Sequence, residues 1–273
     1  MDKLIFGTAG IPISTEPRTT ENGIKQVKKL GLGAMELEFV RSINITKEKA
    51  PNIKTIAESE KIVLTCHAPY YINLNSMEKA KLEASKKRII DSARIAKHCG
   101  AWSVCFHPGF YMKLEKEKVY EKIKGCLSEI VSKLKSEQNN IWIRPETMGK
   151  HTSFGTLNEI LKLSSELDNV MPCIDFAHLH ALNGKNNTYN EFCDILGAVE
   201  KVLGKKGLQN IHAHVSGINY TEEGERNHLC LQDSDFNYKE LIRALKEYKT
   251  QGVVISESPN IEQDALLMKK LFY

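Results

Sequence analysis

The feature that most constrains the fold is a regular alternation of short apolar runs with longer amphipathic stretches. The apolar runs are rich in β-branched side chains, as expected of strands buried on both faces. They lie at residues 4–9, 35–40, 62–68, 103–109, 141–146, 171–178, 211–217 and 253–259. Helical periodicity follows them, near 22–31, 47–60, 76–100, 114–136, 156–167, 188–204, 238–249 and 260–271. Strict alternation implies parallel strands joined by right-handed crossovers.

Eight strand and helix units predict a closed α/β fold, the (β/α)8 TIM barrel. The chain has 273 residues, and such barrels usually have about 250. The alternative is an open, doubly wound sheet, which normally carries a glycine-rich phosphate loop after its first strand. GTAGIP at residues 7–12 matches such a loop poorly, so the barrel is favoured. No linker divides the chain, and we expect one domain over residues 1–273.

Composition narrows the class of protein. Hydrophobic residues make up 41% and charged residues 26%, which is typical of a globular chain. The sequence lacks an apolar run of the roughly 18 to 20 residues that span a bilayer and lacks signal-peptide features, so we expect a cytoplasmic protein without a membrane partner. The seven cysteines include no CxxC pair, which favours reduced, mostly buried thiols over disulfides or a cysteine zinc site. The net charge of +4 permits a polyanionic partner without requiring one.

Side chains able to bind metal stand at the ends of six successive predicted strands. The C-terminal ends of barrel strands gather at one rim, where barrel enzymes hold their catalytic groups. The residues are His67, His107, Glu146, Asp175 with His178, His212 with His214, and Glu257. A lone histidine or carboxylate at a strand end is more often structural. Several crowded together would cost several kcal/mol in repulsion and desolvation unless cations held them, so the set predicts a metal site.

The donor types limit the metal and the number of ions. Imidazoles and carboxylates without thiolates suit Zn²⁺, Mn²⁺ or Fe²⁺ better than Mg²⁺ or Ca²⁺. Glu146 lies in the middle of the series, where its two oxygens can bridge two ions about 3.5 to 4 Å apart. About five or six protein ligands exceed what one catalytic zinc needs, so we expect at least two ions.

Six segments resemble, in order and spacing, the signature segments of endonuclease IV. They are CHAPYYINL (66–74), FHPG (106–109), RPETMGK (144–150), CIDFAH (173–178), the IH of IHAHVSG (211–217) and the SE of VVISESP (253–259). This family, within the xylose isomerase-like barrel superfamily, consists of trinuclear-zinc enzymes that cut DNA at abasic sites. The similarity runs from about residue 62 to the end. It implies a DNA-repair hydrolase with two or three Zn²⁺ ions, acting as a monomer on double-stranded DNA.

The resemblance also implies ligands for the first two metals, with Glu146 as the bridge between them. The other implied ligands are His67 and His107 at the first metal, with Asp175, His212 and Glu257 at the second. The implied chemistry is hydrolysis of the phosphodiester on the 5′ side of an abasic sugar by a metal-bound hydroxide.

A third metal is implied by His178, with His228 in ERNHLCL (225–231) as the best match to its partner. The family has an aspartate two residues before that second histidine, but this chain has Arg226 there and Glu225 one step further back. A cation beside a third zinc is unfavourable unless a loop shift lets Glu225 reach the metal. The third metal is therefore left open.

Four residues are candidates for contact with the substrate. Tyr70 and Tyr71 stand where the family inserts side chains into the duplex, and an aromatic ring can stack in the gap left by a missing base. The alternative for this pair is packing on the barrel rim. Arg41 would replace an arginine of the family's DNA-penetrating loop. His214 would line the substrate pocket or support a metal ligand by hydrogen bonding.

Two other functions stay open. Sugar isomerases and epimerases of the same superfamily hold one divalent metal with a set that matches Glu146, Asp175, His212 and Glu257. His67 and His107 discriminate, because only the nuclease needs both as ligands, whereas MELEF (35–39) resembles the second strand of the sugar enzymes. A non-catalytic barrel that binds nucleic acid is the other alternative. A complete ligand set for two metals argues against it.

Overall fold

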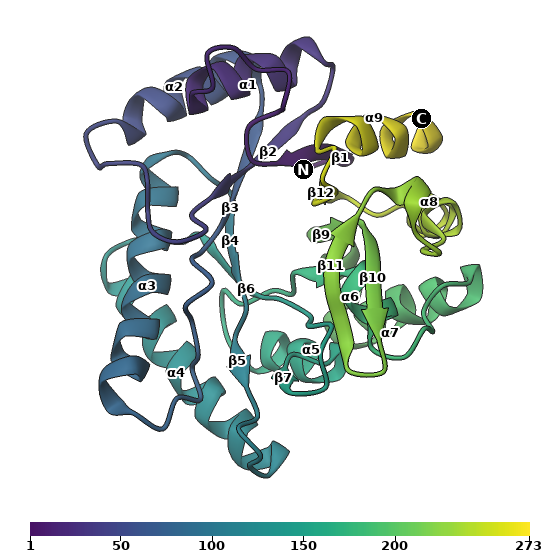
Figure 1. Cartoon of the computed structure of the whole chain (residues 1–273). Helices are drawn as coiled ribbons and strands as arrows, with labels where there is room; N and C mark the ends of the chain where they lie inside the picture. Colours follow the sequence, from purple (N-terminus) through teal and green to yellow (C-terminus); the bar gives the residue numbers. More distant parts are fainter.

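The computed structural model describes residues 1–273 and contains eight parallel strands surrounded by helices (Figure 1). The strands are β1 (Leu4–Ala9), β2 (Ala34–Glu38), β3 (Val63–His67), β4 (Ser103–Phe106), β6 (Trp142–Pro145), β8 (Ile174–Asp175), β9 (Ile211–Val215) and β12 (Gly252–Ser256). Their order in the sheet is β6-β4-β3-β2-β1-β12-β9-β8. The predicted (β/α)8 barrel is confirmed.

The sheet closes between β6 and the segment that leads into β8. The amide of Cys173 donates to the carbonyl of Pro145 at 3.1 Å, and the amide of Thr147 donates to the carbonyl of Cys173 at 3.0 Å. A parallel bridge also joins Ile143 to Val170. Closure brings the C-terminal ends of all eight strands to one rim.

Helices form the outer layer of the barrel (Figure 1). They are α1 (Thr20–Lys29), α2 (Ala50–Glu60), α3 (Lys79–His98), α4 (Lys116–Ser136), α5 (Leu157–Glu166), α7 (Tyr189–Leu208), α8 (Tyr238–Glu247) and α9 (Glu262–Phe272). The helix predicted over 76–100 begins three residues later than expected, and Gly100 follows it with φ of 74°, as a glycine after a helix end often does. None of these helices combines the length and apolarity needed to cross a bilayer.

Several elements on the rim side were not predicted. The expected strand over 171–178 stops at Asp175, and the six-residue helix α6 (Phe176–Ala181) starts at once, because the Asp175 carboxylate accepts from the His178 amide at 2.7 Å and caps the helix. A hairpin of β10 (Gly217–Thr221) and β11 (Gly224–Leu229) follows β9 and contacts α6. The remaining elements are the two-residue strands β5 (Gly109–Phe110) and β7 (Ser153–Phe154) and the 3-10 turn η1 (Leu231–Asp233).

The interior of the barrel holds both apolar and polar side chains, with Val253 at the level of His212 and Ile255 at the level of His214. A small buried cluster of Ala34, Val253 and Ile255 packs against Ile5 and Val63. Several fully buried polar side chains also face inward. They are Glu36, Thr65, Ser103, Cys105, Arg144, Cys173 and His212. Barrel interiors are usually filled by branched aliphatic residues, so this polar layer must satisfy its charges and hydrogen bonds internally.

Candidate metal centre

The first group of donors surrounds one oxygen of Glu146. Nε2 of His67, at the end of β3, lies 3.2 Å from Glu146 Oε2, and Nε2 of His107, just after β4, lies 3.3 Å from the same oxygen. Nδ1 of His67 donates to the carbonyl of Ala68 at 2.7 Å, so Nε2 is the nitrogen that would offer a lone pair to a cation once its proton is lost. Single donor atoms of the two histidines and Glu146 lie within 4.8 Å of one another, so the three can share one cation.

The second group surrounds the other oxygen of Glu146. Nδ1 of His214, on β9, lies 2.8 Å from Glu146 Oε1 and 3.5 Å from Glu257 Oε1. Asp175 completes this group, whose donor atoms also lie within 4.8 Å of one another. Glu146 therefore presents one oxygen to each group, which is the arrangement of a bridging carboxylate.

The crowded charges of the rim shift pKa values in opposite directions. Burial raises the pKa of the Glu257 carboxyl well above its usual value, and the carboxylates of Glu146 and Asp175 raise it further. Burial also acts on Glu146, but the charge of His214 and hydrogen bonds from three histidines hold its pKa well below the usual value. Burial disfavours a charged His67, yet the hydrogen bond and charge of Glu146 raise its pKa to about 10. A shared cation would relieve the repulsion between the carboxylates and would replace the proton on the imidazole.

The expected placement of His212 in the second group is wrong, because His214 occupies that position. His212 is fully buried below the rim, with Nε2 3.0 Å from Glu36 Oε2 and Nδ1 3.1 Å from Ser103 Oγ. The two histidines point the same way because they are two residues apart on a strand. A rise of about 3.3 Å per residue carries His214 roughly 6.6 Å further towards the rim, which is why only His214 reaches Glu146.

The third group lies between α6 and the hairpin. Donor atoms of Asp175, His178 and His228 lie within 4.8 Å of one another. Nδ1 of His178 donates to the carbonyl of Thr147 at 3.0 Å, and its Nε2 lies 2.8 Å from Glu225 Oε2. The residues expected at a third metal are thus together, and Glu225 joins them.

A β-bulge at Arg226 explains how Glu225 reaches this group. Asn219 pairs with Asn227 in the hairpin, but the next pair is Tyr220 with Glu225, so Arg226 has no partner. The extra residue turns Glu225 to the face that simple alternation would give to Arg226. Arg226 is exposed, and the repulsion expected between its charge and a third metal does not arise.

The residues expected to contact substrate lie at or near the rim. The ring of Tyr70 is centred 5.6 Å from that of His67 and 5.7 Å from that of His107, with 51% of the residue exposed. Tyr71 is 63% exposed, and Arg41 is exposed in the loop after β2. Tyr70 is therefore the aromatic side chain that borders the first donor group.

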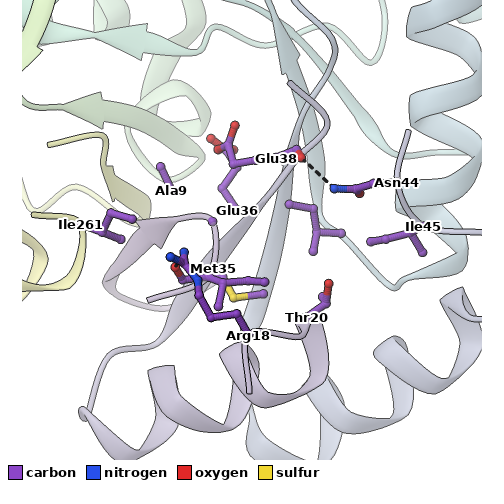
Figure 2. A pocket seen from close by; sticks show the side chains of 12 residues that line it. Ala9, Arg18, Thr20, Met35, Glu36, Glu38, Asn44, Ile45 and Ile261 are labelled. Atoms are coloured by element: carbon purple, nitrogen blue, oxygen red, sulfur yellow. Dashed lines mark hydrogen bonds between the residues drawn. The ribbon is translucent and has the colours of Figure 1, made fainter. Parts of the chain in front are cut away.

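A pocket of about 270 Å³ opens beside β1 and β2, and none of the predicted site residues lines it (Figure 2). Glu36 and Glu38 of β2 line it together with Arg18 and Asn44. Burial and the charge of Glu36 raise the pKa of the Glu38 carboxyl to about 7. The signal for this pocket was present in MELEF, because residues two apart on a strand face the same side of the sheet.

An eight-stranded barrel with histidines and carboxylates gathered at its C-terminal rim defines a class of barrel enzymes whose chemistry sits in the loops of that rim. The chain belongs to the Xylose isomerase-like TIM barrel family, whose pattern matches residues 24–271. Over 270 residues it is 46% identical to the protein of Methanocaldococcus jannaschii named "Uncharacterized protein MJ0133", covering 98% of this chain and 97% of that one.

Solved structures with the same fold include both kinds of enzyme that the sequence left open. Endonuclease IV from Thermus thermophilus superposes with a TM-score of 0.76 at 17% identity, covering 97% of each chain. A D-tagatose 3-epimerase-like protein superposes with a TM-score of 0.73 at 20% identity, covering 97% of this chain and 95% of the other. The resemblance to endonuclease IV is confirmed as a likeness, and at these identities the likeness to solved structures concerns the fold.

Proposed function

We propose that the protein is a divalent-metal-dependent hydrolase that cuts DNA on the 5′ side of abasic sites. The observation that carries the proposal is the environment of the Glu146 carboxylate. Its Oε2 faces His67 and His107, and its Oε1 faces His214. A single-metal sugar enzyme needs only the second donor group. Two donor groups that share one carboxylate, with a third nearby, fit a phosphodiesterase with several cations.

The buried donors fit cations. Asp175 Oδ2 has no hydrogen-bond partner, and neither has Glu225 Oε2, although His178 Nε2 lies 2.8 Å from it. Buried acceptors are rarely left unpaired unless an ion or water satisfies them. Zinc, manganese or iron would suit the imidazole and carboxylate donors, and the bound ions would stabilise the charge that develops on the phosphodiester.

The side chains of this chain then divide the remaining work. Glu146 keeps the first two donor groups at a fixed separation. The carbonyls of Ala68 and Thr147 hold Nδ1 of His67 and His178, so that Nε2 of each ring points into the site. Tyr70, half exposed beside His67, provides a ring on which a base or the edge of a baseless gap can stack.

The proposal is tested by incubating the metal-loaded protein with a duplex that carries one abasic-site analogue. We expect one incision, on the 5′ side of the analogue, with at least one of Zn²⁺, Mn²⁺ and Fe²⁺. An undamaged duplex of the same sequence is the control. Intact duplexes with all three metals, together with turnover of free sugars, would overturn the proposal.

The second candidate function is a sugar isomerase or epimerase, and the pocket beside β2 is the observation that favours it. Glu36 and Glu38 place two carboxyl groups there, which can hydrogen-bond sugar hydroxyls. His107 separates the two candidates. A His107→Ala variant should lose nuclease activity, whereas an epimerase that uses only Glu146, Asp175, His214 and Glu257 should retain its metal.

A further inference from the structure

A second set of metal-competent side chains lies inside the barrel, below the rim. Single donor atoms of Cys105, Cys173, His212 and His214 lie within 4.8 Å of one another, and all four residues are buried. They come from β4, from the segment that leads into β8, and from β9, so three walls of the barrel contribute. The rim groups contain no cysteine, which makes this set chemically distinct from them.

His212 is oriented as a ligand would be. Its Nδ1 lies 3.1 Å from Ser103 Oγ, which can accept the proton on Nδ1 and leave the lone pair on Nε2. Nε2 has no hydrogen-bond partner even though Glu36 Oε2 is 3.0 Å away. The other oxygen of this buried carboxylate, Glu36 Oε1, lies 2.8 Å from His214 Nε2. A cation bound between His212 Nε2 and Glu36 Oε2 would satisfy both of these buried atoms.

Glu36 is a second candidate for the fourth ligand beside His214, because His214 is also a donor of the rim. Nδ1 of His214 is hydrogen-bonded to Glu146 Oε1 at 2.8 Å and so belongs to the rim. Glu36 lies between the layers, with Oε2 3.5 Å from Cys105 Sγ and Oε1 2.8 Å from His214 Nε2. The set available below the rim is therefore two thiols, one imidazole and one carboxylate.

The contacts of Glu36 with His212 and Cys105 are close to the spacing of ligands around a tetrahedral ion. Zinc with bonds of about 2.0 Å to nitrogen or oxygen and 2.3 Å to sulfur separates its ligand atoms by roughly 3.3 to 3.8 Å. The contacts of Glu36 Oε2 with His212 Nε2 and Cys105 Sγ, at 3.0 and 3.5 Å, need shifts of only a few tenths of an ångström. Thiolate donors exclude Mg²⁺ and Ca²⁺ and favour zinc or a chemically similar ion.

We propose that Cys105, Cys173, His212 and Glu36 form a buried structural site for a zinc-class cation, separate from the metals of the rim. Both thiols lose their protons to solvent when the ion binds. The two thiolates and the Glu36 carboxylate then exceed the charge of the dication by one, and the remaining negative charge is accommodated by His214, whose Nε2 lies 2.8 Å from Glu36 Oε1. The bound ion ties β2, β4, β8 and β9 together across the interior. It also fixes Glu36, and through it the position of His214 under the rim.

The experiment uses protein produced in minimal medium in which Co²⁺ replaces zinc and purified under reducing conditions. A thiolate bound to Co²⁺ gives a charge-transfer band in the near ultraviolet that nitrogen and oxygen ligands do not give. We expect the band in the wild-type protein and its loss in Cys105→Ser and Cys173→Ser. Cys66→Ser is the matched control, because Cys66 is equally buried on β3 but lies outside the set, and this variant should keep the band.

His107→Ala should also keep the band, since it removes a ligand of the rim only. The result is thus independent of whether the protein cuts DNA. X-ray absorption of the zinc-loaded wild type gives a second measurement that needs no variant, with a metal–sulfur distance of about 2.3 Å expected. Wild-type protein without the cobalt band, or a zinc spectrum with nitrogen and oxygen neighbours only, would overturn the proposal and leave His212 and Glu36 as a metal-free pair.

Discussion

The two sides of the barrel rim differ in what their side chains can do. The side built on β3, β4, β6, β8, β9 and β12 carries three groups of imidazoles and carboxylates that share Glu146 and Asp175. The side built on β1 and β2 carries no histidine and instead has Glu36 and Glu38 beside a pocket of about 270 Å³. The first side, the proposed cation-binding side, gathers the donor groups of the rim, and the second side lines a pocket next to them.

This difference teaches that metal chemistry and substrate choice are separable in this chain. The signature segments that resemble endonuclease IV begin at about residue 62, after β1 and β2, although the superposition on endonuclease IV covers 97% of this chain. A phosphodiester and a sugar could use the same cations, so the decision between them falls to the β1–β2 side. Substitutions on each side in turn test this division.

The largest effect is expected for Glu146→Gln, because this carboxylate belongs to two donor groups. Loss of a bridging charge removes several kcal/mol of transition-state stabilisation, so activity should fall on the order of 10³-fold, with loss of bound metal. Steady-state kinetics and metal analysis measure both, with exposed Glu83→Gln as the control. Retained activity would show that the cation-binding side is not the active site.

A smaller but sharper contrast is expected between the two histidines of β9. His214→Ala should lower activity on the order of 10²-fold and weaken metal binding at the rim, because His214 contacts Glu146 and Glu257. His212→Ala should leave rim metal largely in place, since its neighbours are Glu36 and Ser103. Equal loss of rim metal in both variants would contradict this assignment.

On the β1–β2 side, Glu38→Gln should change how stability depends on pH. The pKa of Glu38 is raised from 4.5 to about 7 by burial and by Glu36, so the protonated carboxyl stabilises the metal-free fold below pH 4.5 and this contribution is lost as pH rises through 7. Glutamine cannot ionise and should make the protein more stable than wild type at pH 8, by up to about 3 kcal/mol, with little difference at pH 4. Urea unfolding at both pH values measures this, and a constant difference between the proteins would refute it.

The smallest effect is expected at the border between the two sides. Tyr70→Ala should weaken binding of an abasic duplex about tenfold, because stacking of one base on an aromatic ring contributes about 1 to 3 kcal/mol. Tyr70→Phe keeps the ring and should bind normally. Fluorescence anisotropy with abasic and undamaged duplexes provides the measurement, and equal affinity of all three proteins would remove Tyr70 from the substrate site.

The fold and most of the cation-binding side could be predicted from the sequence, because both follow from periodicity and from residues at strand ends. His67, His107, Glu146, Asp175 and Glu257 lie at the rim as their positions after apolar runs indicated. The choice between His212 and His214 could not be made in this way. The alternation of side chains shows which residues of a strand face the interior. It does not show which of these residues lies at the level of the rim.

The interior set of Cys105, Cys173, His212 and His214 could not be predicted from the sequence, for a different reason. Cys105 and Cys173 are far apart in the sequence and meet only because β4 and β8 both flank β6 in the closed barrel. Spacing rules for cysteine zinc sites detect ligands that a single loop or hairpin brings together. They do not detect ligands that barrel closure brings together. The seven cysteines are free and five of them are buried, as expected, and the proposed interior site is the one point at which that expectation would need correction.

The bulge at Arg226 has a consequence for how relatives of this chain can be recognised. It acts as a one-residue insertion that costs one unpaired position and leaves both Glu225 and His228 facing His178. A search pattern that demands an acidic residue two places before the histidine would reject this sequence, although the acidic side chain is in place. Genomes surveyed by fixed spacing would therefore undercount proteins with this arrangement, whereas comparison of strand registers would retain them.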